Sequence, residues 1–239
     1  MSLRGKLVRV LHPALRGWYR WYGSRPRRYR YADLDLVILP GVFHPGLFGS
    51  TRALLNVVER TELQGRTLLE LGAGSGLIAL RAAQLGAQVT ASDVDPQAIA
   101  CLHDNSIRNQ VTMRVIRSDQ FDSIPEHFDH ILINPPYYAK QPKAARELAF
   151  FAGAHREYFD RLFPALAARI RNGSTVHMVL SKDLDLEPLH RMMDASGLRW
   201  KVVHEERWFG EVQVVHQLQH PTALSEPLVT QQVHARGPD

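Results

Sequence analysis

Short apolar runs alternate with amphipathic segments along most of the chain. The runs have the length and composition of buried strands, and we expect strands over residues 34–39, 67–71, 88–92, 112–117, 130–133 and 174–180. The segments between them repeat apolar side chains at helical spacing, which predicts helices over residues 50–62, 77–85, 96–105, 144–152, 158–171 and 186–196. Two last runs, at residues 199–206 and 211–218, are close enough to pair as a hairpin.

This alternation is typical of an α/β fold. Strands joined by helices form a doubly wound, mostly parallel sheet with helices on both faces, and the final hairpin adds an antiparallel edge. We expect Ser50 or Thr51 to cap the helix at residues 50–62, and Asp95 followed by Pro96 to start another helix. In such sheets ligands bind beyond the carboxyl ends of the strands, so the functional residues should lie in the loops that follow them.

The length of 239 residues fits one such domain with a short extension. We expect a basic, aromatic-rich extension, the folded domain and a flexible tail over residues 1–39, 40–220 and 221–239. A helix is predicted over residues 1–22, before the helix-breaking segment at residues 23–26. With one cysteine, no signal peptide pattern and no apolar run of about 20 residues, we expect a cytoplasmic protein without disulfides or membrane spans.

Charge is distributed unevenly along the chain. Residues 1–30 contain nine Arg and Lys residues and no acid, whereas the whole chain carries +5, so the remainder carries −4. Six aromatic residues accompany these cations, namely Trp18, Tyr19, Trp21, Tyr22, Tyr29 and Tyr31. Because arginine pairs with phosphates and flat rings stack on bases, residues 1–31 are a candidate nucleic-acid contact. A helix that packs its rings on the domain, or one that lies on an anionic membrane surface, fits the same composition.

A glycine-rich loop, Glu70-Leu71-Gly72-Ala73-Gly74-Ser75-Gly76, follows the strand at residues 67–71. Glycines permit a tight turn there and let a cofactor approach the backbone closely. The dinucleotide pattern G-x-G-x-x-G/A fails from Gly72, because Leu77 takes the place of a small residue. From Gly74, however, Gly76 and Ala79 satisfy it. The loop therefore leaves a nicotinamide-dependent oxidoreductase open as an alternative.

Acidic and proline-rich segments follow the next three strands. Asp93 ends the second core strand, where a carboxylate can accept hydrogen bonds from both hydroxyls of a ribose, and Asp119 follows the third strand. Asn134-Pro135-Pro136-Tyr137 follows the fourth. Two prolines donate no ladder hydrogen bonds, so they fix a rigid turn at the edge of the sheet. The need for a rigid turn explains the presence of the two prolines, but it does not explain why Asn134 and Tyr137 flank them.

Residues 40–220 resemble the class I S-adenosylmethionine-dependent methyltransferases. The glycine loop is similar to the first motif of that family, and Asn134-Pro135-Pro136-Tyr137 is similar to the fourth motif of its amino-methyltransferases. Within the family, the chain is most similar to protein-glutamine N5-methyltransferases and to small-domain enzymes that modify guanine or adenine in RNA. The resemblance implies S-adenosylmethionine as cofactor and a Rossmann-like sheet of seven strands in the order 3-2-1-4-5-7-6, counted from the first core strand.

The resemblance also implies a role for each motif. The cofactor would be held by Glu70, Gly72, Gly74, Gly76, Asp93, Asp119 and Asn134. Of these, Glu70 would meet the amino-acid end of the cofactor and Asp119 the amino group of its adenine. The catalytic segment would be Asn134, Pro135, Pro136 and Tyr137. Within it, carbonyl oxygens of Asn134 and Pro135 would accept the N–H groups of a planar amide or exocyclic amine, and Tyr137 would stack on that group.

We therefore expect an N-methyltransferase whose acceptor is a protein glutamine or an RNA base. A nucleic-acid-binding protein with a relic cofactor site is a further alternative, which the basic N-terminal segment motivates.

Neither the twelve histidines nor the single cysteine shows the spacing of metal ligands, so no metal site is expected. The resemblance to glutamine methyltransferases begins near residue 40. Bacterial enzymes of this kind that act on release factors carry a larger helical domain before the corresponding point, whereas this chain has about 40 residues there.

Overall fold

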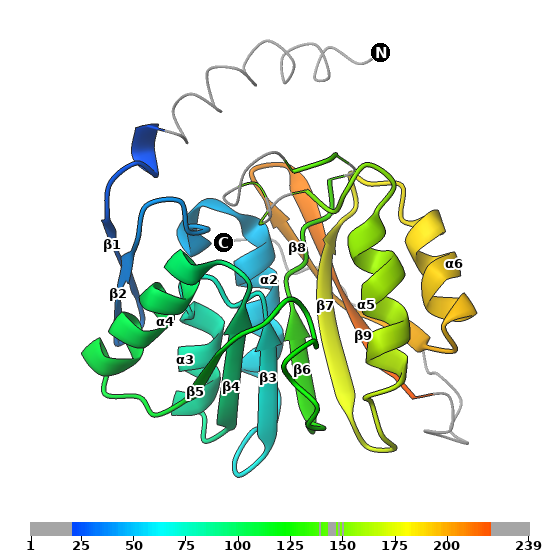
Figure 1. Ribbon diagram of the computed structural model, residues 1–239, viewed down its shortest axis with the longest axis horizontal. Coiled ribbons are helices and arrows are strands. Elements are labelled where there is room, and N and C mark those ends of the chain that lie inside the picture. Colours follow the sequence, from blue (N-terminus) through cyan, green and yellow to red (C-terminus); the bar gives the residue numbers. More distant parts are fainter. Residues whose placement is uncertain (1–20, 139, 143–146, 148, 150, 221–239) are drawn as a thin grey trace, which may run out of the picture.

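A seven-stranded sheet forms the centre of the computed structural model, which describes residues 21–138, 140–142, 147, 149 and 151–220 (Figure 1). The sheet is made of β3 (Thr67–Leu71), β4 (Gln88–Asp93), β5 (Arg114–Arg117), β6 (His130–Ile133), β7 (Thr175–Ser181), β8 (Arg199–Trp208) and β9 (Glu211–Gln219). Their order is β5-β4-β3-β6-β7-β9-β8. Counted from β3, this is the order 3-2-1-4-5-7-6, so the predicted fold is confirmed.

The first five strands of the sheet run parallel, and β9 lies antiparallel between β7 and β8. The turn from β8 to β9 consists of Phe209 and Gly210, whose φ angles are 43° and 85°. Positive φ at both central residues is the geometry of a type I′ hairpin, which matches the twist of the strands it joins. The predicted antiparallel hairpin is therefore present at the edge of the sheet.

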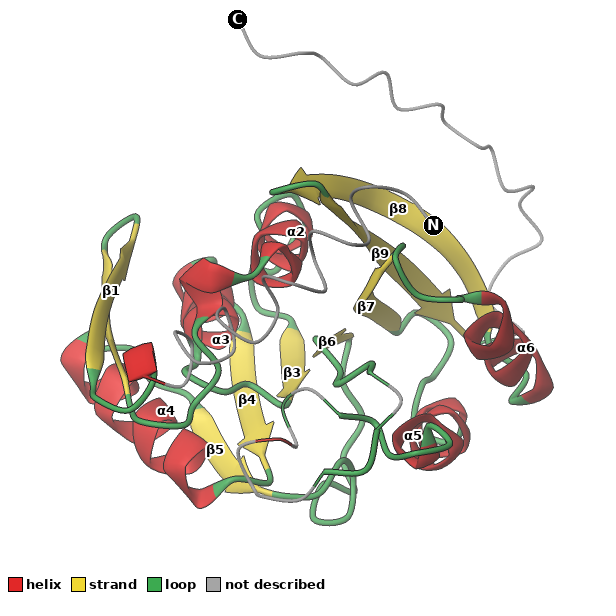
Figure 2. Cartoon of the chain, turned by 90° about the horizontal axis from the view of Figure 1, so that it is seen from above, coloured by secondary structure: helices red, strands yellow, loops and turns green. Residues whose placement is uncertain are grey.

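Helices cover both faces of the sheet (Figure 2). On one face lie α2 (Gly49–Val58), α3 (Leu77–Gln84) and α4 (Pro96–Arg108), which share one apolar core with the sheet. On the other face lie α5 (Glu157–Ala167) and α6 (Glu187–Ala195), which share a second core. As predicted, α4 begins at Pro96, and the Asp95 side chain accepts the N–H of Gln97. A short 3-10 helix, η1 (Pro45–Leu47), precedes α2.

The N-terminal strands β1 (Arg27–Tyr31) and β2 (Leu34–Ile38) form a separate antiparallel hairpin that packs on α4. Leu34, Leu36 and Ile38 of β2 are buried in the first core. Asn105 of α4 is fully buried, and it accepts the Val37 N–H at 2.8 Å and donates to the Ser75 carbonyl at 2.9 Å. One amide therefore ties the hairpin to the helix and to the glycine loop.

Besides shifts of a few residues at the ends of elements, the structure differs from the sequence expectations in three places. We did not predict β1, because alternating Arg and Tyr side chains hide its apolar face. Helix α2 begins at Gly49 with Phe48 as N-cap and no side-chain cap bond, so the predicted cap at Ser50 or Thr51 is wrong, and the helix ends at Val58. The helix predicted over residues 144–152 lies largely outside the described residues, and at its end Phe151 makes an isolated bridge with Tyr138.

The predicted helix over residues 1–22 lies outside the described residues except for its last two positions, and the tail over residues 221–239 lies outside them altogether. Within the part of the chain that the structure describes, no helix is long and apolar enough to cross a membrane.

Candidate active site

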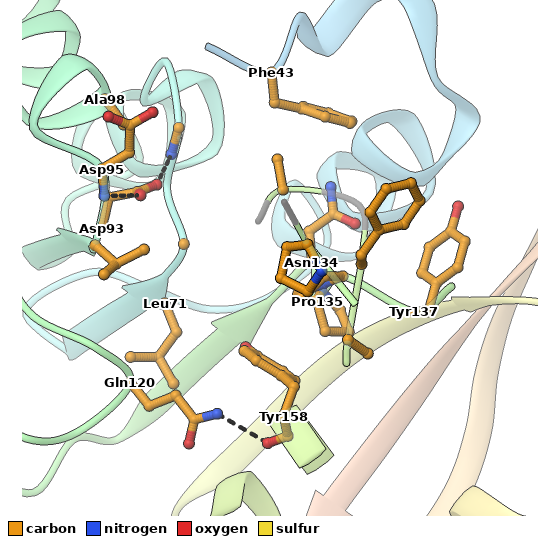
Figure 3. A pocket seen from close by; sticks show the side chains of 18 of the residues that line it. Phe43, Leu71, Asp93, Asp95, Ala98, Gln120, Asn134, Pro135, Tyr137 and Tyr158 are labelled. Atoms are coloured by element: carbon orange, nitrogen blue, oxygen red, sulfur yellow. Dashed lines mark hydrogen bonds between the residues drawn. The ribbon is translucent and has the colours of Figure 1, made fainter. Parts of the chain in front are cut away.

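A cavity of about 390 Å³ lies beyond the carboxyl ends of the parallel strands (Figure 3). The loops after β3, β4, β5 and β6 contribute to its wall, as does the segment before α2 and the start of α5. Eight of the predicted site residues line it, namely Gly72, Gly74, Asp93, Asp119, Asn134, Pro135, Pro136 and Tyr137. Glu70 and Gly76 are not among the lining residues.

The three glycines of the loop after β3 have different surroundings. All three have positive φ angles, which glycine adopts without strain. A Cβ atom on Gly72 would meet nothing within 4 Å, because this residue faces the open cavity. A Cβ on Gly76 would instead lie 2.7 Å from the Leu102 side chain of α4. Gly72 therefore leaves space for a ligand, whereas Gly76 allows the loop to pack closely on α4.

The Asp93 carboxylate holds two loops together at the edge of the cavity (Figure 3). Its two oxygens accept the backbone N–H groups of Gly74 at 2.9 Å and Asp95 at 3.0 Å. Burial raises the pKa of this carboxyl, while these hydrogen bonds lower it. Each oxygen keeps a further lone pair, so a fixed carboxylate at this position can still accept hydrogen bonds from a pair of ligand hydroxyls.

Glu70 lies on β3 behind the glycine loop and is only 3% exposed. It accepts a hydrogen bond from the backbone N–H of Ala79, in the first turn of α3. Its Oε2 atom is buried and has no hydrogen-bond partner among the described residues. Burial, with a smaller contribution from the charge of Asp93, raises the pKa of Glu70 to about 8. The carboxyl is therefore mostly protonated near neutral pH, and its contact with a cofactor stays a prediction.

Asp119 follows β5, lines the cavity and is paired with a residue of α5. Its Oδ2 atom is 2.7 Å from Nη1 of Arg161, which also lies 3.3 Å from Asp122. Both Asp119 and Arg161 line the cavity and are about half exposed. The ion pair engages the Oδ2 atom of Asp119, so its Oδ1 atom can accept a hydrogen bond from a ligand.

Asn134 and Pro135 line the cavity, and Figure 3 shows Phe43 above them and Asp93 and Tyr137 on either side. Pro135 is buried, and Asn134 is partly exposed. The Tyr137 ring packs against the second core. Burial raises the pKa of the Tyr137 hydroxyl far above its ordinary value, and Gln213 of β9 donates a hydrogen bond to it. The four residues therefore form a rigid wall that presents an amide and a neutral phenol.

Three cavity residues on α5, namely Glu157, Tyr158 and Arg161, were not predicted from the sequence. Tyr158 and Arg161 reach the site from the start of this helix, and the Tyr158 carbonyl accepts the Gln120 side chain at 2.8 Å (Figure 3). No local motif marks them, because their position depends on how α5 packs across the sheet. Phe43, in the segment before α2, also lines the cavity, and its ring stacks on that of Phe48 with 4.6 Å between the ring centroids.

The chain is similar to methyltransferases in both sequence and fold. The profile of the methyltransferase small domain family matches residues 33–209, so the chain belongs to this family. A protein of Methanocaldococcus jannaschii, assigned as a protein N5-glutamine methyltransferase, is 29% identical over 186 residues, which cover 72% of this chain and 92% of the relative. The ribosomal RNA small subunit methyltransferase C of Actinobacillus pleuropneumoniae is 32% identical over 115 residues, 47% of this chain and 35% of the relative.

Solved structures show the same relationship. The 16S rRNA guanine-N2 methyltransferase of T. thermophilus, in complex with AdoMet and guanosine, has a TM-score of 0.59 and 25% identity. It matches 82% of this chain, which spans 50% of that enzyme. A methyltransferase from Pyrococcus furiosus has the same fold, with a TM-score of 0.60 and 19% identity over 88% of this chain and 99% of that one. The predicted methyltransferase class is confirmed, and these relatives give no support to the oxidoreductase alternative.

The residues around the cavity fit S-adenosylmethionine. The open space over Gly72 can take a ligand that approaches the backbone, and the fixed carboxylate of Asp93 suits the hydroxyls of a ribose. Asp119 can accept the amino group of an adenine. Among the described residues, no group of three or more His, Cys, Asp or Glu side chains is arranged to hold a metal ion.

We predict that Gly72→Ala weakens the binding of S-adenosylhomocysteine by about tenfold or more, because the added methyl enters the cavity. Titration calorimetry measures the effect. Gly197→Ala is a matched control, since Gly197 also has a positive φ, 74° against 70°, and open space around its Cβ position. Both variants carry the same backbone strain, so equal affinities would contradict a cofactor site at Gly72.

We predict that Glu70→Gln changes how stability depends on pH. The folded pKa of Glu70 is about 8 and its ordinary value is 4.5, so the native state binds the extra proton between these values. Stability of the wild type should therefore fall, relative to the variant, as pH rises from about 5 to 8, by about 1.4 kcal/mol for each pKa unit. Urea unfolding of the cofactor-free proteins measures this difference. Exposed Glu62→Gln is the control, and a Glu70→Gln curve parallel to the wild type would refute the raised pKa.

Proposed function

We propose that the protein transfers a methyl group to the side-chain amide nitrogen of a glutamine in another protein. The central observation is that Asn134-Pro135-Pro136-Tyr137 forms one wall of the cavity, facing the glycine loop and Asp93. The archaeal relative assigned to N5-glutamine methylation supports this acceptor, because the match covers 92% of its length. The ribosomal RNA relative is matched over 35% of its length.

The difficulty of this reaction is the acceptor. The lone pair of an amide nitrogen is delocalised into the carbonyl group, so the nitrogen is a poor nucleophile. S-adenosylmethionine, when bound, supplies an activated methyl group on a sulfonium. The Asn134 side-chain carbonyl and the Pro135 backbone carbonyl accept the two N–H groups of the amide. They align the nitrogen with the methyl group and stabilise the positive charge that develops on the nitrogen.

The surrounding residues limit the motion of the acceptor group. The Tyr137 ring stacks on the planar amide, and its neutral phenol is fixed by the sheet behind it. Pro135 and Pro136 keep the two accepting carbonyls in a rigid turn. No strong base is required, because the methylated nitrogen is acidic and loses its proton to water after transfer.

A second candidate acceptor is a base in RNA, and the basic N-terminal segment favours it. Residues 1–30 carry nine positive charges and no acid. In the described part of this segment, Trp21 is 66% exposed, and the Arg28 and Arg30 side chains are 68% and 76% exposed. Arg27 lies over the Tyr22 ring at 4.2 Å. Exposed guanidinium groups and rings of this kind are suited to phosphates and bases.

The acceptor is tested by adding the enzyme and S-adenosylmethionine with a labelled methyl group to a cell lysate, and then separating protein, RNA and DNA. We predict label in the protein fraction, on a glutamine identified by mass spectrometry. Asn134→Ala should reduce the transfer by about a hundredfold or more, since it removes one of the two acceptors that orient the nitrogen.

Binding of S-adenosylhomocysteine to Asn134→Ala, measured by calorimetry, shows whether that variant keeps its fold and its cofactor site. Label in RNA alone would replace glutamine by the second candidate. A wild-type protein that binds RNA and labels no fraction would instead support the alternative of a binding protein with a relic cofactor site.

We predict that removal of residues 1–20 weakens binding of the enzyme to structured RNA and flattens its dependence on salt. Five of the nine cations of the segment lie within these residues. Each phosphate contact that is lost reduces the slope of the logarithm of the affinity against the logarithm of the salt concentration. Fluorescence anisotropy at a series of salt concentrations measures both effects. Equal slopes for the full chain and the shortened chain would remove nucleic acid as the partner of this segment.

A further inference from the structure

Gln213 is a buried polar side chain beside the target motif that the chemistry above does not use. It lies on β9, two residues after the strand begins, and is 1% exposed. Its side chain donates a hydrogen bond to the hydroxyl of Tyr137. The two residues are far apart in the sequence, and the contact exists because β9 inserts next to β7, within the sheet.

The backbone of Gln213 is held on both sides, because it is paired in register with Ser181 of β7 and Glu206 of β8. Its side chain lies close to the start of α2, where a Cβ atom on Gly49 would lie 3.4 Å from Cγ of Gln213 and 2.6 Å from Cβ of Trp208. Glycine at position 49 allows this close approach. The Gln213 side chain therefore has a fixed position, and its hydrogen bond can restrict the motion of the Tyr137 side chain.

The choice of glutamine at this position has a cost in stability. Its Oε1 atom is buried without a hydrogen-bond partner among the described residues. The next two residues of β9, Val214 and Val215, are buried and apolar. A buried acceptor without a partner destabilises a fold compared with an apolar side chain of the same shape. Packing alone would thus favour an aliphatic residue here, and the amide is explained by what its N–H groups do.

The partner of this hydrogen bond keeps one protonation state. Burial raises the pKa of the Tyr137 hydroxyl, and the nearby charges of Tyr138 and Glu211 raise it further. Glu211 lies on the same strand as Gln213, so the hairpin supplies both the hydrogen-bond donor and a charge that keeps the phenol neutral. A tyrosine ring turns about only two side-chain bonds, so a fixed hydroxyl together with a packed ring leaves it one orientation.

We propose that Gln213 is a positioning residue that holds the Tyr137 ring in the plane needed to stack on the methyl acceptor. This inference rests on the proposed function, because it assumes that Tyr137 meets the acceptor. Gln213 acts through the Tyr137 hydroxyl and touches neither cofactor nor acceptor. The C-terminal hairpin thereby takes part in orienting a group that is bound on the far side of Tyr137.

The test uses Gln213→Met, which keeps the length and shape of the side chain and removes its amide. We expect the initial rate of labelled methyl transfer to RNA-depleted lysate protein to fall about tenfold at saturating S-adenosylmethionine. The affinity for S-adenosylhomocysteine should not change. In a Tyr137→Phe background, the same substitution should have no further effect, because the hydroxyl it acts through is gone.

Gln217→Leu is the matched control, since Gln217 lies on the same strand and pairs with His177, away from the cavity. An unchanged rate in Gln213→Met, or an equal loss with and without the Tyr137 hydroxyl, would overturn the positioning role.

A second measurement does not depend on the acceptor. The protein is labelled with 3-fluorotyrosine and its fluorine NMR spectrum is recorded. The resonance that disappears from the spectrum of Tyr137→Phe is assigned to Tyr137. Gln213→Met should shift and broaden this resonance, and Gln217→Leu should leave it in place. A resonance unaffected by Gln213→Met contradicts the inference. If the resonance responds but the wild type labels no protein, the proposed acceptor fails while the hydrogen bond from Gln213 stands.

Discussion

The Asp93 carboxylate is the interaction on which the geometry of the site depends. Strands β3 and β4 run parallel and in register, so the loops that follow them leave the sheet side by side. Asp93 joins these loops by accepting one backbone N–H group from each, at Gly74 and Asp95. Because Asp95 also caps α4, the same short segment sets the start of that helix. A rearranged carboxylate would therefore move the glycine loop, the helix and the cavity wall together.

Much of this fold could be predicted because its signals are local. The strands at residues 67–71 and 130–133 coincide with β3 and β6, whose apolar runs are buried on both faces. The start of α4 follows from the capping chemistry of Asp95 and Pro96. β1 was missed because its side chains alternate between arginine and tyrosine, and a two-stranded hairpin is stabilised here by its contact with α4. That contact joins segments about 70 residues apart, so no local pattern reports it.

The residues of the site also separate into those that local sequence predicts and those that depend on tertiary packing. Residues at the ends of β3, β4 and β6 could be predicted, because strand ends in a parallel sheet converge on one edge. Tyr158, Arg161 and Gln213 could not, since each reaches the cavity or its wall through tertiary packing. Glu70 and Gly76 belong to the motif by sequence, yet one lies behind the loop and the other against α4. A motif thus contains both the residues that face a ligand and those that shape the loop around it.

The position of β9 has a consequence for how the enzyme is made. This strand is the last element of the described chain, yet it lies between β7 and β8 and supports the ring of Tyr137. During synthesis on the ribosome, residues 67–181 can emerge and begin to pair while that support is still missing. The hairpin of β8 and β9 must then dock as a unit beside β7, which is a non-local and comparatively slow step. Nascent chains should therefore hold cofactor contacts before they hold a working acceptor site.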